Sequence, residues 1–164
     1  MQKQHMERTI LGVSFSSRML GLAVLQSGSL IAYSTKLFKE AWSPAKMDRI
    51  LTSLTSAIAE YAIEDMVLSI PPIHFQGEPF QALWPEVVAL GRNKELKVTS
   101  FTQDTLQALC GSDERMTRKS LMDSLASIYP ELILFYKIES RSKNKYYYKM
   151  FEAIAVATLF VTQV

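Results

Sequence analysis

The stretch that decides the fold reads Thr9-Ile10-Leu11-Gly12-Val13-Ser14-Phe15-Ser16-Ser17-Arg18-Met19-Leu20-Gly21-Leu22-Ala23-Val24-Leu25. Residues 9–15 are apolar and β-favouring with little alternation, which is typical of a strand buried on both faces of a sheet. Small residues then predict a turn, and residues 20–26 predict a second strand beside the first. Ser14 stands where the first strand reaches the turn. A metal site would need a carboxylate there, and a hydroxyl group is a poor substitute.

The rest of the chain predicts an α/β protein with one mixed sheet. Ser27-Gly28 separates the second run from a third at 29–38, so the chain opens as a three-stranded antiparallel meander. Apolar runs at 66–70 and 96–101 predict two more strands, which follow helices and therefore run parallel to the first. A helix is predicted to begin at Ser43-Pro44, and four more are predicted over 80–92, 102–109, 116–128 and 147–161. Residues 131–138 are predicted to form a strand or an extended segment. Residues 140–145 are predicted to form an exposed loop.

Composition is that of a single globular domain spanning 1–164. The 164 residues are 48% hydrophobic and 21% charged, with a formal net charge of +2. The polar residues 1–8 predict a flexible tail. A lone Cys110 excludes an intramolecular disulfide and favours the cytoplasm, and no run approaches the roughly 20 apolar residues of a membrane helix.

Four stretches in order resemble the RuvC family of Holliday junction resolvases and, more loosely, its YqgF relatives. The first is Ile10-Leu11-Gly12-Val13-Ser14-Phe15-Ser16-Ser17-Arg18-Met19-Leu20-Gly21. The others are Val67-Leu68-Ser69-Ile70-Pro71-Pro72 with Gly77 beyond it, Leu109 to Lys119, and Lys149 to Ala157. The resemblance implies a ribonuclease H-like fold, in which a central sheet of three antiparallel and two parallel strands is flanked by helices. It also implies a possible homodimer.

Nucleases that this chain resembles hold two divalent metal ions with four carboxylates. Carried over by resemblance, these positions fall on Ser14, near Ile70 or Pro71, on Lys149 and on Glu152. Only Glu152 is acidic, so no metal-binding set is expected; Mg²⁺ or Mn²⁺ would be a cofactor only if other acids took part. Ser14 is read as a filler rather than a nucleophile, because no base is identifiable beside it.

Several residues keep two interpretations. Glu152 is explained by the favourable dipole at the start of the last helix, or it is a functional carboxylate retained from the family's set and paired with Lys149 or Arg18. His74 is a solvated loop histidine, or it reaches the edge of the sheet as an acid–base group. Asp104, Asp113, Glu114 and Asp123 are caps and solvated side chains, or replacement carboxylates.

Basic residues form two clusters that predict contact with nucleic acid. One cluster is Arg115, Arg118 and Lys119; the other is Arg141, Lys143, Lys145 and Lys149, interleaved with Tyr146, Tyr147 and Tyr148. Cations contact phosphates and aromatic rings stack on exposed bases, although a solvated loop with partly buried tyrosines fits the same pattern. Arg18, in the turn that the family shares, is the remaining candidate.

The sequence therefore predicts a RuvC-like pseudo-nuclease that binds structured or branched DNA or RNA, or acts as a scaffold in DNA processing. Two alternatives remain open. The first is an active, divergent metal-dependent endonuclease that recruits Glu152, His74 and other acids. The second is an assembly protein without nucleic-acid contact.

Overall fold

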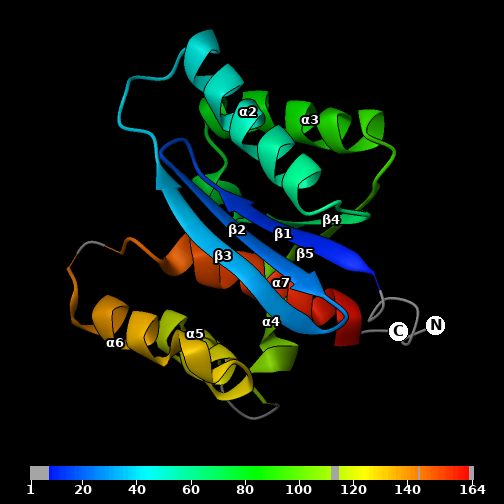
Figure 1. Cartoon of the computed structure of the whole chain (residues 1–164). Helices are drawn as coiled ribbons and strands as arrows, with labels where there is room; N and C mark the ends of the chain where they lie inside the picture. The colour runs from blue at the N-terminus through cyan, green and yellow to red at the C-terminus, as the bar shows by residue number, and fades with distance from the viewer. Residues whose placement is uncertain (1–7, 112–114, 144, 163–164) are drawn as a thin grey trace.

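A computed structural model describes residues 8–111, 115–143 and 145–162. In this part of the chain, five strands form one sheet in the order β3-β2-β1-β4-β5 (Figure 1). Strands β1 (Thr9–Phe15), β2 (Met19–Gln26) and β3 (Ser29–Leu37) are antiparallel neighbours. Strands β4 (Asp65–Ile70) and β5 (Lys97–Thr102) run parallel to β1. The predicted sheet of three antiparallel and two parallel strands is confirmed.

Two helices cover one face of the sheet (Figure 1). Helix α2 (Pro44–Glu60) begins as predicted, because the Ser43 side chain accepts a hydrogen bond from the Lys46 N–H at 3.1 Å. Helix α3 (Glu78–Asn93) follows the short η1 turn (Ile73–Phe75). Both pack on an apolar layer that includes Leu11 and Val13 of β1.

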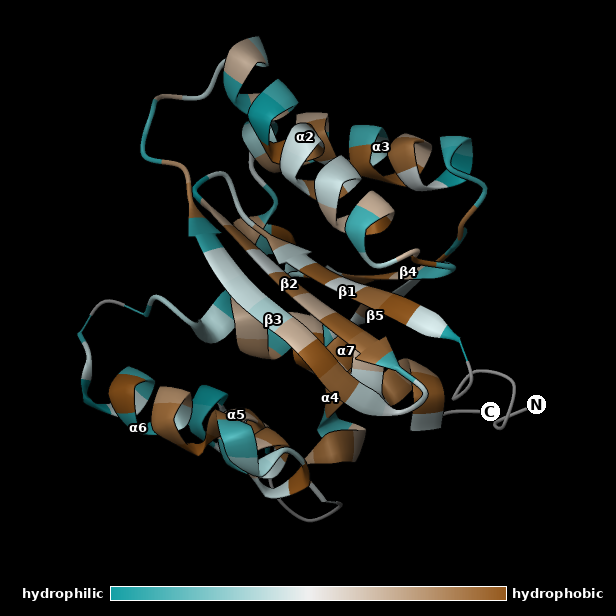
Figure 2. Cartoon of the chain, in the orientation of Figure 1, coloured by the Kyte–Doolittle hydropathy of each residue, from teal (hydrophilic) through white to brown (hydrophobic). Residues whose placement is uncertain are grey.

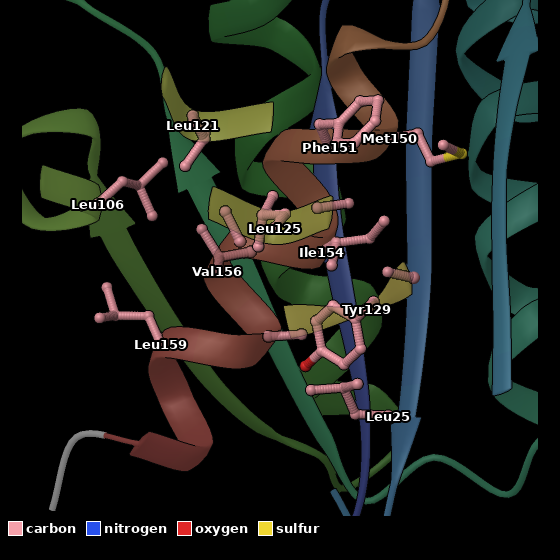
Figure 3. Packing of buried hydrophobic residues seen from close by; sticks show 14 of the residues in the cluster. Leu25, Leu106, Leu121, Leu125, Tyr129, Met150, Phe151, Ile154, Val156 and Leu159 are labelled. Carbon is pink, nitrogen blue, oxygen red and sulfur yellow. The ribbon is translucent and has the colours of Figure 1, made fainter. Parts of the chain in front are cut away.

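The opposite face is covered by α7 (Tyr148–Thr162), with α5 (Arg118–Ile128) packed outside it. Side chains from α5 and α7 point toward one another in Figure 3, where Leu125 lies near Ile154. Figure 2 shows hydrophobic residues along β1, β2 and α7. Every residue of α7 from Met150 to Val161 is buried, so this helix is the centre of the second core rather than a surface helix.

Short elements complete the α5–α7 side of the molecule. They are α4 (Gln103–Leu106), η2 (Gln107–Leu109), η3 (Pro130–Leu132) and α6 (Ile133–Arg141). The prediction of a strand or extended segment at 131–138 was wrong, because these residues form η3 and most of α6. The predicted loop at 140–145 is also shorter than expected, since Ser140 and Arg141 belong to α6.

The ends of the predicted domain are described only in part. Residues 1–7 of the expected tail lie outside the described residues. Arg8 is described, and its guanidinium group forms an ion pair with the buried carboxylate of Asp65 at the start of β4. Among the helices of the described ranges, none combines the length and the apolar character needed to cross a membrane.

Candidate nucleic-acid interface

A cavity of about 550 Å³ opens beside the end of β1. Its walls come from the β1–β2 turn, the segment after β4, the residue that follows β5, and the first residues of α5 and α7. Phe15, Pro71, Pro72 and Phe80 give it an apolar side, whereas Arg118, Lys145, Lys149 and Glu152 bring charge. The segments that carry the family resemblance therefore meet at one place in the fold.

Two glycines bring α7 close enough to the sheet to form this site. A Cβ atom on Gly12 would lie 2.0 Å from the carbonyl oxygen of Ala153, and one on Gly21 would lie 2.1 Å from that of Lys149. Gly21 is paired with Ser14 across the β1–β2 ladder. The lack of a side chain at Gly12 and Gly21 thus lets the first turns of α7 lie directly over Ser14.

Ser14 and Glu152 are joined inside the protein. The Ser14 hydroxyl donates a hydrogen bond of 3.1 Å to Oε1 of Glu152, and the two residues are each only 1% exposed. Glu152 is the fifth residue of α7, so its carboxylate lies beyond the first turn. The helix dipole alone does not account for it, because that effect fades within one turn.

Glu152 has partners at both carboxylate oxygens. The Lys149 ammonium lies 3.0 Å from Oε1, as an i,i+3 ion pair on the same helix. Nε2 of Gln103 donates a 2.5 Å hydrogen bond to Oε2. A buried carboxylate is stable when it is paired and hydrogen-bonded in this way. Of the two partners considered for Glu152, Lys149 forms the ion pair, and Arg18 is an exposed residue of the turn.

The residues of this cavity do not fit a pair of divalent metal ions. Glu152 is the one carboxylate among the lining residues that the structure describes, and Pro71 and Pro72 line the cavity where β4 ends. Within the described ranges no group of three or more His, Cys, Asp or Glu side chains could hold a metal ion. A hard cation prefers several anionic oxygens, and here an ammonium group already lies against Glu152.

His74 and the described candidate acids other than Glu152 are exposed side chains. His74 is exposed on η1, where its ring lies 4.2 Å from that of Phe75. Asp104 and Asp123 are exposed on α4 and α5. Asp113 and Glu114 lie outside the described residues.

The predicted basic residues divide into distinct groups. Arg118, Lys145 and Lys149 line the cavity, and Arg118 is also exposed. The described lining does not include the other five, which are all exposed: Arg18, Arg115, Lys119, Arg141 and Lys143. The ammonium group of Lys145 donates hydrogen bonds to the backbone carbonyls of Glu139 at 2.8 Å and Ser142 at 2.9 Å. Lys145 thus holds the connection between α6 and α7 in addition to lining the cavity.

Arg118 and Tyr148 form a second pair at the entrance. The Arg118 guanidinium group lies 4.7 Å from the centre of the Tyr148 ring, a cation–π geometry. Burial raises the pKa of the Tyr148 phenol well above its usual range; the negative charge of Glu152 adds to this, and Arg118 opposes it. Tyr148 is therefore a neutral ring that supports Arg118.

Sequence reasoning missed the role of Gln103. It lies at the start of the helix predicted over 102–109, but its side chain, directly after β5, donates a hydrogen bond to the carboxylate of Glu152. Its place directly after β5 could have indicated this role, because β5 and β1 run in the same direction and end at the same edge of the sheet.

Comparison with known proteins supports the fold. No family model and no curated protein sequence matches the chain. The chain is similar to RuvC of Thermus thermophilus in complex with a Holliday junction substrate, with a TM-score of 0.69 and 11% identity over 93% of this chain and 91% of that chain. It is also similar to the fowlpox virus resolvase in complex with Holliday junction DNA, with a TM-score of 0.57 and 12% identity over 94% and 97% of the two chains. The sheet order and these likenesses identify the predicted ribonuclease H-like fold.

Proposed function

We propose that this chain is a RuvC-like protein that binds structured or branched nucleic acid without cleaving it. The arrangement around Glu152 carries this proposal. The carboxylate that matches a metal-ligand position of the family has Lys149 and Ser14 at one oxygen and Gln103 at the other. A metal ion would have to displace these partners and then find its remaining ligands elsewhere.

The charge of the cavity supports a nucleic-acid ligand. Among its described lining residues are three cations, Arg118, Lys145 and Lys149, and one anion, Glu152, which together carry a formal charge of +2. Exposed Arg18, Arg115 and Lys119 add positive charge on neighbouring segments. Positive groups bind the phosphate backbone whatever its sequence, which favours recognition of shape over recognition of bases.

The ligands of two known structures that share this fold also support a nucleic-acid ligand. The RuvC and fowlpox resolvase structures both contain Holliday junction DNA. A chain that keeps the fold and a positive cavity, but pairs its acid internally, is suited to hold such a substrate as a scaffold in DNA processing.

The test is to incubate the pure protein with labelled four-way junctions and single strands in Mg²⁺ or Mn²⁺. Native gels then report binding, and denaturing gels report cleavage. We expect a salt-sensitive complex with the junction and intact strands. Cleavage that Glu152→Ala abolishes would establish the active nuclease instead. Absence of binding at low salt would favour an assembly protein that does not contact nucleic acid.

A further inference from the structure

We propose that Lys149 and Arg118 form a phosphate-binding site in this cavity, in which the ammonium group of Lys149 supplies the positive charge without a divalent cation. This inference rests on the proposed nucleic-acid binding and adds to it the group that is bound and the residues that bind it. The ligand is a phosphate of the nucleic-acid backbone.

Lys149 is held in place and still faces the cavity. Its backbone packs against Gly21, and its ammonium lies 3.0 Å from Glu152. An ammonium has three N–H donors, and Glu152 is its one ion-pair partner within the described ranges. The Lys149 side chain is 21% exposed and lines the cavity, so its remaining donors can reach a bound anion.

Glu152 orients Lys149 rather than neutralising the whole site. Ser14 and Gln103 donate to the same carboxylate, so its negative charge is shared among three donors. The Glu152 side chain is 1% exposed, whereas the Lys149 side chain is 21% exposed. An approaching anion therefore meets the cation before it meets the buried acid.

Arg118 supplies the second contact. Its guanidinium group is supported by the ring of Tyr148, and Arg118 is the first residue of α5, whose start is fixed by a capping box between Thr117 and Ser120. A planar guanidinium group can donate two parallel hydrogen bonds to a phosphate, a geometry that lysine cannot provide.

The surroundings strengthen this pair. Prolines and phenylalanines form the facing wall, and a less polar environment strengthens the attraction between a cation and a phosphate. The first residues of α5 and α7 also line the cavity, so the positive ends of two helix dipoles act on the same ligand.

The experiment measures binding of a fluorescent four-way junction by anisotropy, in EDTA and in Mg²⁺ at matched ionic strength. We expect the same Kd for the wild-type protein in both buffers. Lys149→Met/Glu152→Gln removes the ion pair while keeping the formal charge of the cavity. It should raise Kd about tenfold and lower the salt slope by about one. Lys94→Ala, which removes an exposed cation just before β5, at the end of that strand opposite to the cavity, should bind as the wild type does.

The outcomes separate this inference from the function on which it rests. Junction binding that requires Mg²⁺, or wild-type affinity in Lys149→Met/Glu152→Gln, would overturn the phosphate site and leave nucleic-acid binding intact. No junction binding in either buffer would overturn both. Displacement of the junction by millimolar AMP would assign the site to a free nucleotide and overturn its assignment to the backbone. Comparison of the two buffers needs no variant, so it stands even if a substitution prevents folding.

Discussion

Gly21 and Lys149 lie so close that a Cβ atom on the glycine would be 2.1 Å from the lysine carbonyl oxygen and 2.5 Å from the next backbone nitrogen. Van der Waals contact between such atoms requires well over 3 Å, so the first turn of α7 depends on the missing side chain. The same turn carries Lys149 to its place beside Glu152. The glycine of the opening motif thus connects the fold to the charged site.

Gly21→Ala should lower the free energy of unfolding by about 3 kcal/mol, because backbone atoms cannot move aside as a flexible side chain can. Urea denaturation measures this loss. Gly77→Ser is the matched control, since the nearest atom to its new Cβ is 3.8 Å away and serine is a favourable N-cap for α3. Equal stability of the two variants would show that α7 can shift away from the sheet.

Lys145→Ala should destabilise the protein by about 1 kcal/mol, because its ammonium donates to two backbone carbonyls near the end of α6. Lys143→Ala provides the comparison, since Lys143 is exposed two residues away and its loss should change stability by less than about 0.5 kcal/mol. Thermal unfolding measures both. If neither variant lowers Tm, the contacts of Lys145 do not contribute to stability.

The raised pKa of Tyr148 predicts a loss of stability in alkali. An unfolded tyrosine ionises at pH ~10, whereas the buried phenol keeps its proton, so the unfolded state loses protons first. The stabilisation that the protonated Tyr148 phenol gives the folded state is fully present below pH ~10 and declines as the pH rises further. Tyr148→Phe should therefore flatten the alkaline part of a plot of unfolding free energy against pH.

Tyr129, whose pKa burial also raises, should preserve part of the alkaline slope in that variant. The exposed Tyr146 offers the control: Tyr146→Phe should show the same dependence of unfolding free energy on pH as the wild type. An unchanged profile in Tyr148→Phe would contradict this assignment.

Ser14→Asp combined with Lys149→Asp should create a site for Mn²⁺. Ser14 Oγ lies 3.1 Å from Glu152, and Lys149 Nζ lies 3.0 Å from it, so the two new carboxylates would converge with the existing one. Three carboxylates suit a hard divalent cation. Calorimetry should detect Mn²⁺ binding to this variant and none to the wild type. Binding to the wild type alone would contradict the reading of Lys149 as the resident cation.

Much of the fold could be predicted because it follows local patterns. The unbroken apolar run of β1, the turn at Ser27-Gly28 and the Ser43-Pro44 helix start each lie within a few residues of chain. Helix α6 was missed because its Ile, Phe and Tyr residues favour strands in isolation. Distant contacts stabilise it as a helix, since the Phe135 ring packs edge-on against Tyr33 and Tyr147.

The site was predicted to a similar degree. Ser14, Lys149 and Glu152 were identified from their places in the family motifs, and the structure brings all three together. The partnership of Gln103 with Glu152 spans 49 residues, and no local pattern reports it. Two lysines of the second basic cluster differ in what they do, and composition does not distinguish them. Lys145 donates hydrogen bonds to backbone carbonyls, whereas Lys143 is exposed.

In this structure an ammonium group, rather than a metal ion, neutralises Glu152. A crystal soaked in Mn²⁺ tests it most directly, because the anomalous signal of manganese marks any bound ion. We expect no manganese peak at Glu152 and the Lys149 ammonium within ion-pair distance of that carboxylate. A peak coordinated by Glu152, with Lys149 turned away from it, would show that a metal ion displaces the ammonium group and would restore the active nuclease as the best explanation.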